Sequence, residues 1–234
     1  MAYFRSNAVH VSPGIVGGTC KEWSQVCHMG EKHVFPSGHL LTFEGDHFDD
    51  FLYLQSGKVT GIYLGADGLS NVALFYESGV LLNEKVAILG SCNNPTRYVC
   101  ETDCIVYVFR ASLLHSSEFI QKHPNLIYSM LVGQASKNLS QELIRSSLYR
   151  RTALQKLCCF LLTLSQRNNN QNEFAPGISQ IDIARLLGMH KSSMARCVNF
   201  LKVNGIISKF SKNSLHIINK SMLEKYSLTP FDNL

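Results

Sequence analysis

The stretch that decides the fold is Ile178–Ile218, which reads ISQIDIARLLGMHKSSMARCVNFLKVNGIISKFSKNSLHII. Ser179 is a good N-cap with an acidic residue three positions on, and apolar residues at helical spacing follow it, so a short helix is predicted there. Gly188–His190 predicts a tight turn, and Lys191–Val203 predicts a second helix with one apolar face. Lys209–Ser214 then forms the polar, basic tip of a hairpin. The pattern is a helix, a glycine turn, a helix and a two-stranded wing.

This arrangement suits DNA, because a helix fits the major groove and its N-terminal side chains then face the base edges. Lys191 and Arg196 can donate to guanine O6 and N7, and the amides near Ser179 suit a phosphate. Either cation alone would more often be an ordinary exposed helix residue, but their place after the glycine turn favours DNA. The candidate DNA-binding residues are Ser179, Lys191, Ser192, Ser193, Arg196, Lys209 and Lys212.

The charge distribution points the same way. The formal net charge of +5 divides into −4 over residues 1–144 and +9 over residues 145–234. A basic C-terminal part on an acidic body favours a polyanion-binding module, although a solvated basic face is the alternative. Neither a secretory signal nor an apolar run long enough to cross a membrane is evident, so we expect a cytoplasmic protein without membrane contact.

The N-terminal part, from about Lys32 to Phe109, alternates short apolar runs with turns such as Ser56-Gly57 and Asp67-Gly68. Turns that recur roughly every ten residues predict an all-β barrel or sandwich. The segment Ser112–Ile120 then predicts a short helix.

A long helix is predicted over Asn125–Ser147, where no proline interrupts about six turns. The apolar residues of this helix form one stripe, which needs a partner to pack against. That partner is the barrel, a second copy of the chain, or both; a plain core helix is the alternative. A further helix is predicted over Ala153–Gln166, and Arg167–Gly177 is expected to be a loop. The apolar stripe of the long helix consists of Ile127, Leu131, Val132, Ala135, Leu139 and Leu143.

In order and spacing these motifs resemble the Crp/Fnr superfamily of transcription regulators. The resemblance implies an α+β protein with an N-terminal double-stranded β-helix (β-roll or jelly-roll) sensor domain at 1–122, a dimerisation helix at 123–148 and a winged helix-turn-helix domain at 149–234. It rests on Pro36-x-Gly38, Glu44-Gly45-Asp46, Tyr53–Val59, Asp67-Gly68, Gly79, Ile181–Gly188, Ser193-x-x-Arg196 and Leu201–Ile207.

The same resemblance implies a homodimer that reads palindromic double-stranded DNA, with RNA polymerase as a further partner and no enzymatic activity. Lys191, Ser192 and Arg196 match the family's base-reading positions. Ser192 replaces a glutamate that many members use, so the operator half-site is expected to differ from the common one.

Departures from the family pattern bear on which small molecule the sensor domain binds. Cyclic-nucleotide-binding members hold the phosphate with an arginine, whereas Asn94-Pro95 aligns there and Arg97 is displaced by three residues. Glu84 keeps the acidic position, but Asn83 replaces the usual glycine. Without a cation in register a buried phosphate is poorly compensated, so no cyclic nucleotide is expected.

No cofactor is predicted. Only Cys20 and Cys27 lie near the N-terminal position of the cysteine cluster in oxygen-sensing members, so no iron–sulfur cluster is expected. Haem remains an alternative because the chain has nine histidines.

The expected signal is therefore a small molecule bound between the β-roll and the long helix. Gly188-x-His190 and the basic wing are similar to those of regulators of halogenated-aromatic respiration, which implies an aromatic, weakly acidic effector. For each candidate, ordinary packing or solvent exposure is the competing role. The candidate effector-binding residues are Tyr76, Glu84, Tyr98, Gln134 and Lys137.

Two other functions compete with this one. A thiol-redox regulator of the same fold would use Cys20 and Cys27, which are expected in a less structured region than the buried Cys158, Cys159 and Cys197. A metal-dependent barrel enzyme would need clustered ligands, whereas His33, His39 and His47 fall on different turns; we therefore expect no metal site.

Overall fold

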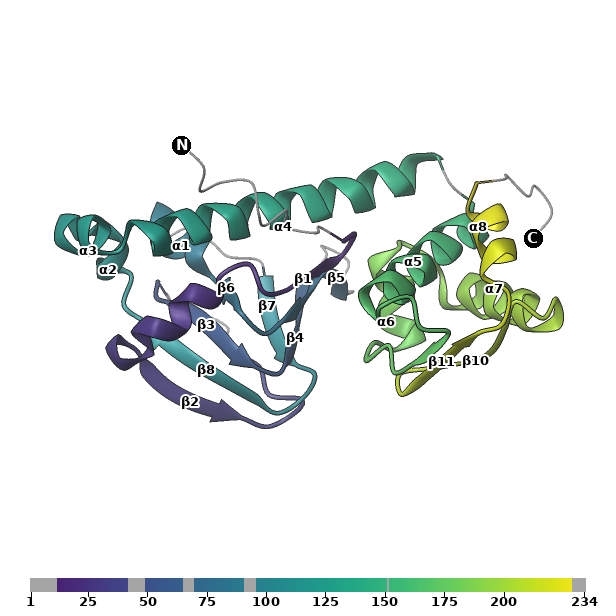
Figure 1. The fold of residues 1–234 in the computed structure, drawn as a ribbon, viewed down its shortest axis with the longest axis horizontal. Coiled ribbons are helices and arrows are strands. Elements are labelled where there is room, and N and C mark those ends of the chain that lie inside the picture. The colour runs from purple at the N-terminus through teal and green to yellow at the C-terminus, as the bar shows by residue number, and fades with distance from the viewer. Residues whose placement is uncertain (1–11, 42–48, 65–69, 91–95, 151, 229–234) are drawn as a thin grey trace. The chain divides into compact units, whose positions relative to one another are not determined.

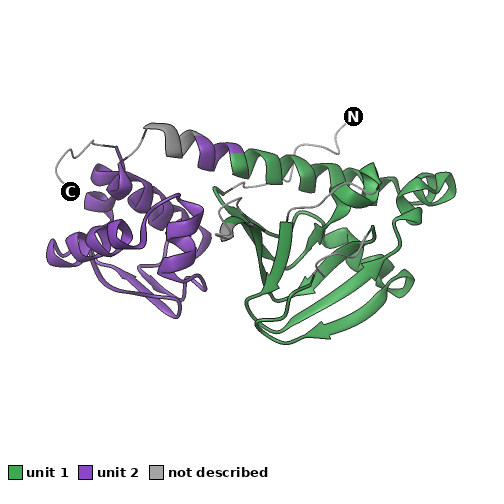
Figure 2. Ribbon diagram, turned by 180° about the vertical axis from the view of Figure 1, so that it is seen from behind, with its two compact units in different colours: residues 1–141 green, residues 142–234 purple. Residues whose placement is uncertain are grey.

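The chain divides into two compact units, Met1–Gln141 and Glu142–Leu234 (Figure 2). The computed structural model describes residues 12–41, 49–64, 70–90, 96–150 and 152–228. The expected domain boundaries at residues 122 and 148 bracket a single helix that passes from one unit into the other, so the three-part division remains a prediction.

The first unit contains two four-stranded sheets, ordered β1-β5-β4-β7 and β2-β8-β3-β6 (Figure 1). The pairs are nested, since β3 pairs with β8 and β4 with β7, while β1 joins β5 in parallel. This is the β-roll that the sequence predicted. The strands are β1 (Ile15–Val16), β2 (Glu31–Phe35), β3 (Phe51–Ser56), β4 (Lys58–Leu64), β5 (Ser70–Glu77), β6 (Val80–Leu82), β7 (Thr96–Cys100) and β8 (Cys104–Phe109).

The helices of this unit lie at its chain ends and between strands. The single helix expected over Ser112–Ile120 is two helices, because Ser116 has extended backbone and its hydroxyl caps the second one by accepting from Phe119 N at 3.2 Å. Neither η1 nor α1 was predicted. The helices are η1 (Lys21–Met29), α1 (Glu84–Leu89), α2 (Ser112–His115), α3 (Ser117–Lys122) and α4 (Pro124–Arg150).

The core of the first unit gathers around Trp23, the single tryptophan of the chain, whose side chain is fully buried. Its ring meets Phe51 and Phe109 edge-on, at centroid distances of 5.3 and 5.4 Å. Its indole N–H donates to Leu126 O at 3.3 Å. Trp23 therefore joins the N-terminal segment, the sheet and α4 in one core.

Helix α4 has two different faces. The face toward the roll buries Leu126, Met130, Gly133, Lys137 and Ser140, at helical spacing. The predicted apolar stripe lies mainly on the other face, where Leu131 is 62% and Leu139 45% exposed. Of the partners considered for the stripe, the barrel is thus not the main one.

The second unit contains α5 (Ala153–Arg167), α6 (Gln180–Leu186), α7 (Lys191–Val203), α8 (Lys220–Leu228) and a small sheet, ordered β10-β11-β9. The expected two-stranded wing is wrong in one respect. A third strand, β9 (Glu173–Phe174), pairs with β11 (Ser214–Ile217) beside β10 (Ile207–Ser211), and it comes from the segment expected to be a loop. Helix α8 was not predicted.

No helix in the described part of the chain combines the length and the apolar character that crossing a membrane requires.

Candidate DNA-binding surface and effector cavity

The turn between α6 and α7 depends on Gly188. Its φ of 58° is left-handed, a conformation that glycine adopts without steric cost. Met189 N donates to Ala184 O at 2.8 Å, which closes the end of α6. The chain is then extended at His190, the N-cap of α7. The predicted helix–turn–helix is confirmed.

Helix α7 presents a polar face to solvent. Met194, Cys197, Val198 and Leu201 are buried, as a helix packed by one stripe requires. On the other side Lys191, Ser192 and Arg196 are exposed and Ser193 is half-buried, with Arg196 Nη2 3.4 Å from Ser193 Oγ. The structure thus brings the four predicted residues together at the N-terminal half of one exposed helix face.

The wing is tied to the start of the helix–turn–helix by hydrogen bonds that two of its backbone carbonyls accept. Gln180 Nε2 donates to Phe210 O at 2.6 Å, and Gly177 N donates to Lys212 O at 2.8 Å. Lys209 is exposed and Lys212 half-buried, so the hairpin presents cationic side chains beside α6.

Ser179 acts as the predicted N-cap of α6. Its hydroxyl accepts from Asp182 N at 3.2 Å and lies 2.5 Å from Asp182 Oδ2, while Arg185 pairs with the same carboxylate at 3.4 Å. The hydroxyl is therefore committed to the cap, and any phosphate contact at this end would use the backbone. That contact stays a prediction.

The five predicted effector-binding residues all line one cavity of about 110 Å³ in the first unit, between the roll and the inner face of α4. Tyr76 and Tyr98 come from the sheet, Glu84 begins α1, and Gln134 and Lys137 come from α4. Their placement supports the sequence reasoning; that they bind an effector remains a prediction.

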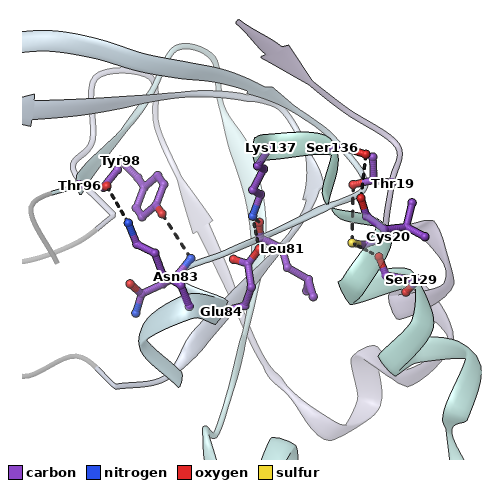
Figure 3. Close-up of polar contacts among 12 residues, drawn as sticks. Thr19, Cys20, Leu81, Asn83, Glu84, Thr96, Tyr98, Ser129, Ser136 and Lys137 are labelled. Atoms are coloured by element: carbon purple, nitrogen blue, oxygen red, sulfur yellow. Dashed lines mark hydrogen bonds and ion pairs between the residues drawn. The ribbon is translucent and has the colours of Figure 1, made fainter. Parts of the chain in front are cut away.

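Lys137 is the buried cation of this cavity. Its ammonium group forms an ion pair with Glu84 and donates to Leu81 O at 2.7 Å (Figure 3). It also lies 5.7 Å from the centroid of the Tyr76 ring, within cation–π range. Three elements of the roll, β5, β6 and α1, thus contact one side chain of α4.

Tyrosine rings form the apolar wall of the cavity. Tyr76 and Tyr98 meet edge-on at 5.8 Å, and Tyr98 Oη accepts from Asn83 N at 3.4 Å (Figure 3). Burial first, and then the neighbouring Tyr98 and Glu84, raise the pKa of Tyr76 well above its ordinary value. Tyr76 is therefore a neutral hydroxyl at physiological pH.

The sequence analysis missed about half of the residues that line the cavity. The helical period of α4 could have identified one of them, because it places Gln141 on the same face as two predicted residues. Gln134, Lys137 and Gln141 lie one turn apart on one helix face. Lys85, whose Nζ donates to Thr96 Oγ1 at 3.2 Å, could be placed only by the tertiary structure. The residues missed are Tyr63, Leu74, Lys85, Thr96, Asn138 and Gln141.

The family departures noted in the sequence have a structural counterpart. Asn83 has a φ of 63°, a left-handed position that favours glycine and that asparagine tolerates better than most residues. Asn94-Pro95 lies outside the described residues. Arg97 is described, and it is not among the described residues that line the cavity.

The expectation for Cys20 and Cys27 is wrong. Neither lies in a loosely structured region, because Cys27 is in η1 and Cys20 precedes it, buried with its thiol donating to Ser129 O at 3.3 Å. Burial raises the pKa of both thiols. Both are therefore poor redox sensors.

Residues 155–226 match the Crp-like helix-turn-helix domain, which covers α6, α7 and the wing. Among solved structures, the chain is similar to CprK complexed with OCPA at 15% identity and a TM-score of 0.75, over 93% of this chain and 99% of that one. It is also similar to FixK2 from Bradyrhizobium japonicum, at 18% identity and a TM-score of 0.69, over 86% and 99%.

A third similar structure is the c-di-GMP responsive regulator CLP from Xanthomonas campestris, at 18% identity and a TM-score of 0.72, over 83% of this chain and 97% of that one. No curated protein sequence matches the chain.

Proposed function

Because this chain has the Crp/Fnr fold and a Crp-like helix-turn-helix domain, we propose that it is a homodimeric transcription regulator controlled by a small molecule bound in its first unit. The observation that carries the DNA-binding part is the exposed, cationic N-terminal half of α7. A palindromic operator is expected, because a dimer presents two such helices, and RNA polymerase is the proposed partner at the promoter.

The outer face of α4 supports the dimer. Tyr128, Leu131 and Leu139 are 52%, 62% and 45% exposed, and they recur at helical spacing on the face that the roll does not cover. Such a stripe on a long helix is typical of a surface that packs against a second helix. We propose that it packs against the same stripe of a second copy.

The lining of the cavity supports a small aromatic effector with an acidic group. The cavity of about 110 Å³ is smaller than the cavity of about 150 Å³ that binds benzene, so it limits the effector to one small ring at most. Tyr76 and Tyr98 offer ring contacts, and Lys85 offers a cation to a phenolate or carboxylate, whereas the charge of Lys137 is already paired with Glu84. No histidine is among the described lining residues, which favours this proposal over haem.

Control would follow from a shift in populations. The helix would have two positions relative to the roll, and an effector on its inner face would bind one of them more tightly. Only such a difference in affinity can shift the equilibrium between the two positions. Because the dimer stripe is on the outer face of the same helix, that shift changes the dimer geometry. The geometry in turn sets whether two recognition helices match half-sites about one DNA turn apart.

Selection of bound DNA from a random double-stranded pool tests the DNA-binding proposal. The wild-type chain should enrich a palindrome with half-sites separated by about 10 base pairs. Binding of the selected DNA is then measured with a panel of one-ring phenols, aromatic carboxylates, nucleotides and haem. Enrichment of no symmetric sequence would contradict the regulator; a palindrome whose binding no compound changes would contradict only the effector.

A further inference from the structure

The outer face of α4 carries exposed residues at a spacing that suits a pair of helices. The helix is continuous from Pro124 to Arg150 (Figure 1). In a two-helix coiled coil the contacts recur every seven residues, at one position and at a second position three residues further on. Two exposed rows follow this spacing: Tyr128, Ala135 and Glu142 in one, and Leu131, Asn138 and Arg145 in the other.

Both rows become polar toward the C-terminal end of the helix. The first turns present Tyr128 and Leu131, which are 52% and 62% exposed. Asn138 follows Leu131 in its row, and the rows end in Glu142 and Arg145, which carry opposite charges. The outer face is therefore apolar at one end, polar but uncharged in the middle, and charged at the other end.

The polar middle of this face points to a second copy of the chain as its occupant. An asparagine at a core position of a helix pair costs stability, but it fixes the register and the number of helices. Two copies in register would place their Asn138 side chains together, where each amide can both donate and accept a hydrogen bond. An apolar helix from another protein would leave the same amide without a partner.

The charged end decides the direction of the pairing. In a parallel pair in register, Glu142 of each copy packs beside Arg145 of the other, so the two-fold symmetry gives two reciprocal ion pairs. In an antiparallel pair centred on Ala135, Glu142 would instead face Tyr128 of the other copy. Burying an ion against an apolar surface is costly, so the charges favour the parallel pair.

We propose that Glu142 and Arg145 form ion pairs between two copies and thereby select a second copy of this chain as the dimer partner. This inference rests on the dimer proposed above and adds the residues that choose the partner. A related chain with the same charge at both positions would be repelled, although its apolar face would fit. The charges thus supply specificity, and the apolar residues supply affinity.

The charges should change partner choice more than affinity. Ion pairs at the edge of an interface contribute little net stability, because water and salt screen them. Removing both charges, by Glu142→Gln with Arg145→Gln, should therefore leave the chain dimeric. Placing like charges at both positions should weaken the dimer, and salt should reduce that effect.

Mixing two charge variants of the full chain tests the selection. Glu142→Arg makes the charged end positive at both positions, and Arg145→Glu makes it negative at both. Each variant alone should dimerise more weakly than wild type. In an equal mixture the mixed dimer should exceed its random ratio to the two homodimers by about fivefold, an effect that a few exposed ion pairs can produce. Native mass spectrometry separates the three dimers by mass.

Two control chains show whether charge is the cause. Glu142→Arg combined with Arg145→Glu in one chain exchanges the two charges, so it should dimerise as wild type does. The Glu142→Gln, Arg145→Gln chain should pair equally well with either charge variant. Both side chains are exposed, so these chains should fold, which circular dichroism checks.

The outcomes separate this inference from the dimer itself. Charge variants that dimerise but mix at random would overturn the ion pairs and leave the dimer intact. A wild-type chain that is monomeric would contradict the dimer, and the proposed ion pairs with it.

Discussion

At the residue scale, the two candidate sites use cations in opposite ways. Arg196 and Lys191 are exposed on α7, where water keeps the cost of their charge low until DNA replaces it. Lys137 is buried and already paired with Glu84, so its charge is compensated within the fold. An exposed cation can be lost without unfolding the protein, whereas a buried one leaves its partner uncompensated.

Replacing Arg196 with Ala should cost about 1–3 kcal/mol of operator binding and relax sequence preference at one base position. The reason is that a guanine contact carries sequence information, whereas a phosphate contact does not. Gel-shift titration on operator and scrambled DNA measures both. The control is Lys202→Ala, at the exposed far end of α7. Equal affinity of the Arg196 variant for the operator would argue against its role.

Replacing Lys137 with Met should lower the unfolding free energy of the first unit by about 3–5 kcal/mol, because Glu84 is left buried without its counter-charge. Adding Glu84→Gln should recover most of that loss. Urea unfolding followed by the fluorescence of Trp23, which lies in the core of this unit, measures both variants. A single variant as stable as wild type would show that the pair is not structurally important.

At the scale of elements, α4 packs closely on the N-terminal segment because small residues allow it. Ser140 Oγ donates to Ser12 O at 2.6 Å and accepts from Gly14 N at 2.8 Å. Ser136 lies one turn before Ser140 on the same helix face, and Gly133 lies two turns before it. The side chain of Cys20 packs against Gly133. The segment that carries β1 is thus fastened to the helix that carries Lys137.

Replacing Gly133 with Ala tests that close approach. A Cβ there would lie 2.8 Å from Cys20 Sγ, a clash that should cost about 1–3 kcal/mol and outweigh the gain of about 1 kcal/mol in helix propensity. In a Cys20→Ala background the clash disappears, so the same substitution should be neutral or stabilising. Thermal unfolding of the four chains measures the difference. A Gly133→Ala single variant more stable than wild type would contradict this packing.

At the scale of the whole molecule, the chain combines a first unit that contains the proposed effector cavity and a second unit that contains the Crp-like helix-turn-helix domain, and α4 belongs partly to each. Its outer stripe is the surface proposed for a second copy. Replacing Leu131 and Leu139 together with Glu should convert the dimer to a monomer and weaken operator binding at least tenfold, because charges would enter an apolar interface.

Light scattering during size-exclusion chromatography gives the mass, and a Leu131→Met, Leu139→Met control should stay dimeric. A wild-type chain that is monomeric at micromolar concentration would contradict the proposed interface.

The sequence predicted those helices and strands whose defining features, such as apolar spacing and turn residues, lie close together in the chain. The bounds of α7 agree with the prediction, since its apolar spacing and the glycine turn are encoded within one stretch. The stripe of α4 was visible, but which face meets the roll was not, because burial of Gly133 and Ser140 depends on Ser12, Gly14 and Cys20 far away in the chain.

By itself, the sequence determined the fold class, the recognition helix with its outward cations, and five residues that line the cavity. These follow from helix period, turn chemistry and family resemblance. Only the tertiary structure decided that Lys137 pairs with Glu84 and that Cys20 is buried. The physical reason is that burial and pairing are set by which distant segments meet, and no local pattern records that.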